Sequence, residues 1–68
     1  MYKYTINKHA QNNGDHEIHK SGCSHEPLPR NRVDLGYQID DFSALNAGKR
    51  IYQKADGCVH CCPVIHHH

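Results

Sequence analysis

Residues Asp56 to His68 read DGCVHCCPVIHHH, which places three cysteines and four histidines within one short segment. Cys58 and Cys61 have the C-x-x-C spacing. In this spacing a tight turn brings two sulfurs onto one tetrahedral ion, while amides of the turn donate to the thiolates. One such pair supplies only half of a four-ligand site, so the fold has to bring a second pair of donors to it.

The second pair of donors lies in the segment EIHKSGC, residues 17–23. His19 and Cys23 flank a Ser-Gly turn, and a chain reversal there would bring both side chains to the same side. Three thiolates and one imidazole form a donor set that zinc prefers in tetrahedral geometry. The sequence therefore predicts a structural zinc site. Its ligands would be His19, Cys23, Cys58 and Cys61.

The short length of the chain makes a stabilising metal site useful. A domain of this size buries only about 60% of its unfolded surface, so its core is marginal. The sequence has 68 residues, 37% of them apolar, and no tryptophan. Small domains commonly gain the missing stability from a metal, from disulfides or from oligomerisation. We expect one domain over residues 1–65, and we set His66–His68 apart as a candidate remnant of a purification tag.

Period-two alternation predicts three strands. Residues 2–8 (YKYTINK) and 16–20 (HEIHK) flank the turn signal QNNGD and form a hairpin, and residues 32–39 (RVDLGYQI) form a third strand. The apolar side chains expected on the buried faces are Tyr2, Tyr4, Ile6, Val33, Leu35, Tyr37 and Ile39.

A helix is predicted to begin near Phe42, with Asp40 or Asp41 as its N-cap, and to stop at Gly57. Its apolar stripe would consist of Ala44, Leu45, Ala47, Gly48, Ile51 and Tyr52. The predicted fold class is α+β: a three-stranded antiparallel sheet with one packed helix and a C-terminal Cys-x2-Cys knuckle.

The segments IHKSGC and SALNAGKRIYQKADGCVHC resemble the zinc-binding domain family of the Ada alkylation-response protein. Members of that family pair a ligand-x3-Cys turn after a strand with an alanine-containing helix and a closing Cys-x2-Cys. The resemblance extends from about Asn12 to Cys62. It implies that His19, Cys23, Cys58 and Cys61 are the zinc ligands.

The chain departs from the repair proteins at the first ligand position, where the family has a cysteine and this sequence has His19. That cysteine accepts a methyl group from a DNA phosphotriester. An imidazole can hold zinc, but it is not the thiolate nucleophile that metal-activated methyl transfer requires. In addition, the segment between Cys23 and Cys58 is longer than usual for the family, and Asp56-Gly57 stands where the family tends to place proline. The resemblance therefore favours a structural or binding use of the scaffold.

Several alternatives remain open from the sequence. The cysteines could be reduced packing residues of a metal-free domain. A thiol redox or alkyl-acceptor role is less favoured, because redox C-x-x-C pairs normally open a helix and this pair follows one. Cys62, His25 or His60 could also replace one of the ligands, although C-x2-C spacing favours Cys61 over Cys62.

The remaining features predict a binding or adaptor module rather than an enzyme. No Ser-His-Asp set or catalytic carboxylate pair is recognisable, and the basic residues are scattered among acids at a net charge of +1. A nucleic-acid partner is therefore only weakly suggested beside a protein partner. The sequence has no apolar run of signal-peptide or membrane-spanning length, so we expect a cytoplasmic monomer with reduced thiols and no membrane partner.

Overall fold

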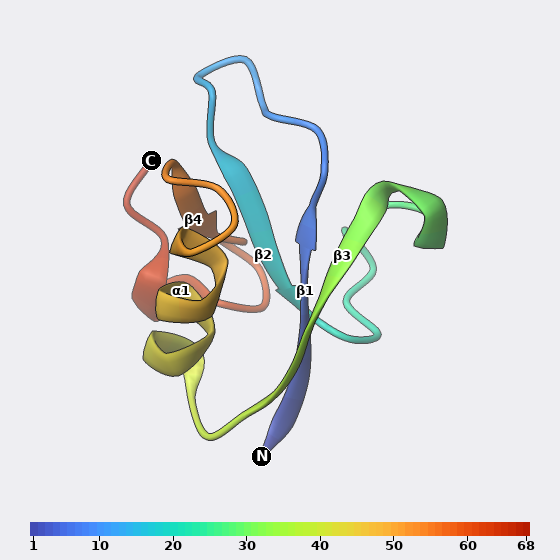
Figure 1. Ribbon diagram of the computed structural model, residues 1–68, viewed down its shortest axis with the longest axis vertical. Coiled ribbons are helices and arrows are strands. Elements are labelled where there is room, and N and C mark those ends of the chain that lie inside the picture. Colours follow the sequence, from blue (N-terminus) through green and yellow to red (C-terminus); the bar gives the residue numbers. More distant parts are fainter.

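The fold is a four-stranded mixed sheet with one helix packed on it, described by a computed structural model for all residues from Met1 to His68 (Figure 1). The strands lie in the order β3-β1-β2-β4. In chain order the elements are β1 (Tyr2–Asn7), β2 (His16–Lys20), the 3-10 turn η1 (Pro29–Asn31), β3 (Arg32–Gln38), α1 (Asp41–Lys49), β4 (Ala55–Gly57) and the 3-10 turn η2 (Pro63–Ile65).

The predicted hairpin and third strand are confirmed. β1 pairs antiparallel with β2, with Thr5 opposite His19, and pairs antiparallel with β3 on its other side. The QNNGD segment makes the turn between β1 and β2, where Gly14 has a φ of 91° that a residue with a side chain rarely adopts.

The prediction of a three-stranded, wholly antiparallel sheet is wrong, because a fourth strand runs parallel to β2. In β4, Ala55 lies opposite His16 and Gly57 opposite Ile18. Its three residues, Ala-Asp-Gly, have low strand propensity and are too few to show alternation. A parallel neighbour needs a long connection, which here includes α1. The pairing makes β2 a central strand and places the segment after β4 beside the end of β2.

An irregularity in β3 explains why the predicted burial of Tyr37 and Ile39 is wrong. The register between β1 and β3 shifts by one residue, and Leu35 is the extra residue in β3. Gly36 follows it with a φ of 73°. The bulge reverses the alternation beyond it, so Leu35 is buried while Tyr37 and Ile39 are exposed. Tyr2, at the start of β1, is exposed as well, so three of the expected core residues lie at the surface.

Helix α1 begins as predicted, with Asp40 as the N-cap that accepts a hydrogen bond from the Ser43 amide at 2.8 Å. It packs on the sheet through small residues. Ala44 and Gly48 are buried, and a Cβ on Gly48 would lie only 2.8 Å from Cδ1 of Ile18. The absence of a side chain at Gly48 therefore sets how closely the helix approaches the sheet.

The helix ends at Lys49, well before the predicted stop at Gly57. The amides of Ile51 and Tyr52 both donate to the carbonyl of Gly48, and the chain then turns into β4. Because the helix is shorter than predicted, Ile51 leaves the apolar stripe and is 47% exposed, which contradicts its predicted burial.

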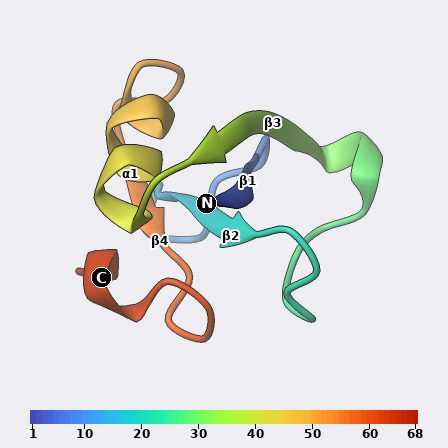
Figure 2. The same cartoon turned by 90° about the horizontal axis from the view of Figure 1, so that it is seen from below.

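The tail after the Cys-x2-Cys segment packs into the core, which the sequence did not suggest. Cys62 and Ile65 are both fully buried, and Ile65 lies against Gly57. In Figure 2, α1 and this tail both lie toward the β4 side of the view, and the loop between β2 and β3 lies on the opposite side. The buried apolar cluster consists of Tyr4, Ile6, Ile18, Leu35, Ala44, Ala55, Cys62 and Ile65. Neither α1 nor any other helix has the length and apolar character needed to traverse a bilayer.

Candidate metal centre

The end of β2 and the turn after it position the first two donors. His19 lies on β2 between its partners β1 and β4 and is 1% exposed. The Cys23 amide donates to the Lys20 carbonyl at 3.1 Å, which closes the predicted reversal, and Gly22 has a φ of 93° in that turn. A glycine is needed there because side-chain-bearing residues rarely adopt this conformation.

The segment after β4 positions the other two donors. The Cys58 amide donates to the Ile18 carbonyl at 2.8 Å, which extends the β2–β4 ladder by one residue. The Cys62 amide then donates to the Cys58 carbonyl at 2.8 Å and folds residues 58–62 into a compact turn. This turn projects Cys58 and Cys61 toward the end of β2.

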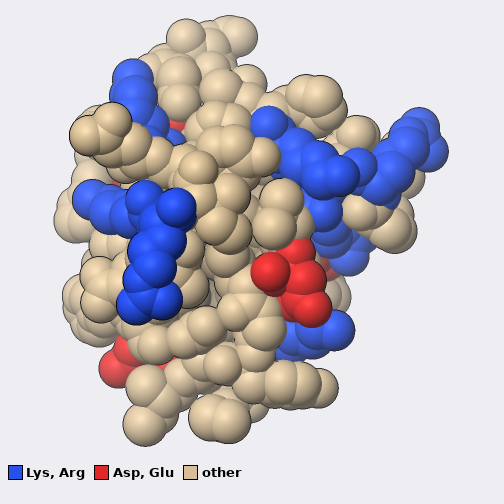
Figure 3. Space-filling view, in the orientation of Figure 1, with Lys and Arg blue, Asp and Glu red and all other residues tan.

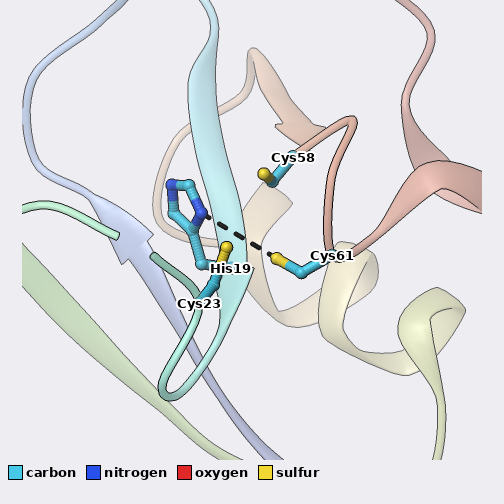
Figure 4. Close-up of side chains that lie close together, drawn as sticks. All are labelled: His19, Cys23, Cys58 and Cys61. Carbon is cyan, nitrogen blue, oxygen red and sulfur yellow. Dashed lines mark hydrogen bonds between the residues drawn. The ribbon is translucent and has the colours of Figure 1, made fainter. Parts of the chain in front are cut away.

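The four predicted ligands come together. One donor atom from each of His19, Cys23, Cys58 and Cys61 lies within 4.8 Å of every other, and Figure 4 shows the four side chains pointing toward a common centre. In a tetrahedral site with Zn–S bonds of about 2.3 Å, two sulfurs lie about 3.8 Å apart. An ion would therefore need to draw the donors inward by only about 1 Å. No disulfide competes, because all four cysteines of the chain are free thiols.

The orientation of His19 matches that of a metal-bound imidazole. Its Nδ1 faces the centre, 3.9 Å from Cys61 Sγ (Figure 4). Its Nε2 lies 3.2 Å from Oε1 of Glu17. Metal-ligating histidines usually donate their second N–H to a carboxylate or carbonyl, which fixes the tautomer and raises the basicity of the ligand. Glu17 occupies the position of that partner. The alternation of a strand places residues 17 and 19 on one face, a signal that could have found Glu17 in the sequence.

A second carboxylate braces the loop that carries Cys23. Glu26 accepts hydrogen bonds from the Thr5 hydroxyl at 2.5 Å and from the Gly22 amide at 3.2 Å. The same carboxylate pairs with Arg32 at 3.2 Å. These contacts tie the loop after β2 to β1 and β3, so the position of Cys23 is fixed by the sheet. Nothing in the sequence marked Glu26, because its partners are distant along the chain.

Burial governs the protonation of the metal-free donors. Burial raises the pKa of the Cys61 thiol far above its ordinary value, and the Lys20 amide, which donates to Cys61 Sγ at 3.4 Å, opposes this shift only in part. Burial also lowers the pKa of His19, against the opposing effect of Glu17. Without an ion, the centre therefore favours a neutral imidazole and a protonated Cys61. A divalent cation would reverse the preference at sulfur.

The other candidate ligands lie outside the group of converging donors. Cys62 Sγ is 3.8 Å from Cys61 Sγ, but its side chain is fully buried in the apolar core. The rings of His25 and His60 stack on each other at 3.8 Å beside the site, and both residues are exposed. The arrangement therefore separates a core thiol and a surface histidine pair from the four donors.

The donor set is chemically suited to a closed tetrahedral site. Four protein ligands would complete the coordination of zinc and leave no open position for water or substrate, which is the pattern of structural rather than catalytic zinc. The backbone amides of Lys20 and His60 each lie 3.4 Å from a cysteine sulfur, Cys61 and Cys58 respectively. Such amides stabilise negative charge on thiolates.

Comparison with known proteins finds no matching family model, no matching curated protein and no matching solved structure. The resemblance to the Ada-type zinc domains therefore rests on the sequence segments quoted above, and the case for the centre rests on its own geometry.

Proposed function

We propose that the chain is a small zinc-binding module in which the ion has a structural role and the surface serves as a binding or adaptor domain. The observation that carries this proposal is the convergence of three thiols and one imidazole from two distant segments of the chain. The placement of Glu17 on the outer nitrogen of His19 is a second supporting observation, because metal-ligating histidines usually donate their other N–H to a carboxylate or carbonyl.

The ion would join the two halves of the fold. His19 and Cys23 belong to the hairpin side, whereas Cys58 and Cys61 belong to the segment after α1. An apparent binding free energy on the order of 10–16 kcal/mol is typical of structural zinc in small peptides at neutral pH. That is comparable with or larger than the total stability of a small domain. Zinc would therefore contribute to folding itself, with His19 and three thiolates as its ligands.

Elemental analysis of protein purified without added metal tests the proposal. We expect one zinc ion per chain. Replacement by Co²⁺ should give intense near-ultraviolet thiolate-to-cobalt bands together with the visible bands of a tetrahedral ion. The thiolate bands distinguish cobalt bound at the four donors from cobalt bound at the terminal histidines, because the histidines provide no thiolate. Metal-free protein, or bound cobalt without thiolate bands, would refute the proposal.

Removal of the ion tests the structural role. A chelator should loosen the Ser21-Gly22 turn and the segment 58–62, and amide hydrogen exchange should rise in these two segments. Exchange in α1, which carries none of the four donors, serves as the internal control. Unchanged exchange in the two ligand segments after complete removal of zinc would contradict a structural role.

The partner class is proposed from the distribution of charge. On the face drawn in Figure 3, the Lys and Arg side chains form separate groups divided by uncharged and acidic atoms. A nucleic-acid binder usually presents a continuous basic patch. We therefore favour a protein partner. Fluorescence anisotropy with labelled single- and double-stranded oligonucleotides at physiological salt should show no binding, and salt-dependent binding there would shift the proposal to nucleic acid.

A further inference from the structure

A second group of donor atoms lies near the opposite end of the β2–β4 pair. Asp15 immediately precedes β2, Asp56 is the middle residue of β4, and His68 comes from the tail. One donor atom from each lies within 4.8 Å of the other two. Figure 1 shows the C-terminal end of the chain near β4 and the start of β2, consistent with this contact.

Asp15 is buried without a hydrogen bond to one of its carboxylate oxygens. The residue is 3% exposed, and Oδ2 accepts no hydrogen bond of adequate geometry. Oδ2 lies 2.7 Å from Nδ1 of His68, a contact that is an ion pair only when that histidine is protonated. A buried carboxylate oxygen that lacks a proper partner is costly. This oxygen points into the cluster.

Asp56 is held firmly by the tail. The amides of His67 and His68 donate to its two carboxylate oxygens at 2.9 and 3.2 Å, and Nδ1 of His66 lies 3.3 Å from Oδ2. These bonds fix the course of the last residues and direct the His68 ring toward Asp15. The terminal histidines, set apart in the sequence analysis, are therefore integrated in the fold.

The only ion-pair partners of the two carboxylates are histidines, His68 for Asp15 and His66 for Asp56. No lysine or arginine forms an ion pair with Asp15 or Asp56, and the nearby Lys54 ammonium donates to the Asn13 carbonyl instead. Two buried carboxylates close together repel each other. A divalent ion among them would neutralise both charges and occupy the free lone pairs of Asp15.

We propose that Asp15, Asp56 and His68 form a second cation site. It would bind a first-row divalent ion through one oxygen of each carboxylate and Nδ1 of His68. Two carboxylate oxygens and one imidazole suit Mn²⁺ and similar ions better than a thiolate-rich site does. His68 is largely exposed, so water completes the coordination from the open side. The proposal does not depend on zinc at the thiolate centre.

Titration of the zinc-loaded chain with Mn²⁺ tests the site, with free Mn²⁺ measured by electron paramagnetic resonance. We expect one Mn²⁺ ion per chain. Asp15→Asn and His68→Ala should each weaken binding by at least about tenfold, since the first replaces an anionic ligand by a neutral amide and the second removes the imidazole. His67→Ala is the matched control: it removes an exposed neighbouring ring but keeps the amide that donates to Asp56, so its affinity should equal that of the unchanged protein.

The pattern across the variants decides the outcome. Equal losses for His67→Ala and His68→Ala, or no loss for Asp15→Asn, would mean that loose terminal histidines chelate the ion and would overturn the site. In NMR spectra, paramagnetic broadening by bound Mn²⁺ should be strongest for the backbone amide signals near Asp15 and Asp56. Broadening centred on Cys58 and Cys61 would also overturn it. Zinc content measured in the same samples keeps a failure here distinct from a failure of the zinc proposal.

Discussion

Cys61 and Cys62 are neighbours in the chain with opposite surroundings. Cys61 is half-buried and converges with three other donors, whereas Cys62 is fully buried among apolar side chains. The sulfurs lie only 3.8 Å apart, so proximity alone does not distinguish them. The direction of each side chain does, because Cys61 points from the turn toward the other donors whereas Cys62 points into the apolar core.

Replacing each of these cysteines by serine should therefore give different results. Cys61→Ser should release zinc, because a hydroxyl is a poor substitute for a thiolate ligand. Cys62→Ser should retain zinc but lower the free energy of unfolding by about 1–3 kcal/mol, because it buries a hydroxyl among apolar groups. Metal analysis of both variants measures the zinc content, and denaturant titration measures the free energy of unfolding. Zinc loss in Cys62→Ser with zinc retained in Cys61→Ser would reverse the ligand assignment.

Glu17 should matter for affinity although it does not touch the ion. Glu17→Gln keeps the size of the side chain but weakens the contact to Nε2 of His19. We expect zinc affinity to fall by about 10–100-fold, with little change in fold. Competition with a chromophoric chelator measures the change. Lys20→Gln, one residue after His19, is the control for net charge. General electrostatics would raise zinc affinity there because a positive charge is removed, so a gain that matches the Glu17→Gln loss would assign the effect to charge alone.

The four converging donors could be predicted from sequence because the ligands of tetrahedral zinc sites commonly follow short, recognisable spacings of cysteine and histidine. His19, Cys23, Cys58 and Cys61 were identified in this way, and the structure brings them together. The groups around them have no such spacing. Glu26 is defined by contacts to Thr5 and Arg32, and Asp15 by contact with the tail, so only the folded chain reveals them.

At the scale of elements, the helix is anchored to the sheet through β2. Ile18 is fully buried beneath Gly48, whereas Ile51 lies beyond the end of α1 and is 47% exposed. Ile18→Ala should lower the free energy of unfolding of the zinc-loaded protein by about 2–5 kcal/mol, since it leaves a cavity. Ile51→Ala should cost less than about 1 kcal/mol. Denaturant titration compares the two, and equal losses would contradict the end of the helix at Lys49.

Strong local signals explain which elements were predictable. The hairpin, the third strand and the Asp40 cap each rest on alternation, turn residues or a capping side chain within a few positions. β4 and the end of α1 have no such signals. The three residues of β4 become a strand because β2 offers them a free edge, and the bulge at Leu35 is visible only as a change in pairing.

For the whole molecule, the buried side chains of His19 and Cys62 set a pH window for the metal-free fold. Burial lowers the pKa of His19 below its ordinary 6.5, so the unfolded chain takes up a proton first, and stability falls as the pH drops below 6.5. Burial raises the pKa of Cys62 from 9.0 to about 11. The unfolded chain therefore loses its thiol proton first, and stability falls as the pH rises above 9.0.

Metal-free protein should thus be most stable between pH 6.5 and 9.0. Denaturation across this range, with chelator and reductant present, measures the window. The control for the alkaline side is Cys62→Ala, which should flatten the decline above 9.0 that Cys62 contributes. A stability that keeps rising above that pH would contradict the burial of the thiols.

The bulge at Leu35 and Gly36 also affects how the molecule meets its own copies. β3 is an outer strand of the sheet, and its free edge carries unpaired backbone groups that could template the strand of another chain. A bulge twists that edge and interrupts the regular spacing of its hydrogen-bond donors and acceptors in the middle of the seven-residue strand. A regular strand can match the donors and acceptors on one side of Leu35 but not on both. The same bulge that turns Tyr37 outward thus disfavours amyloid-like pairing of the exposed β3 edge with another chain.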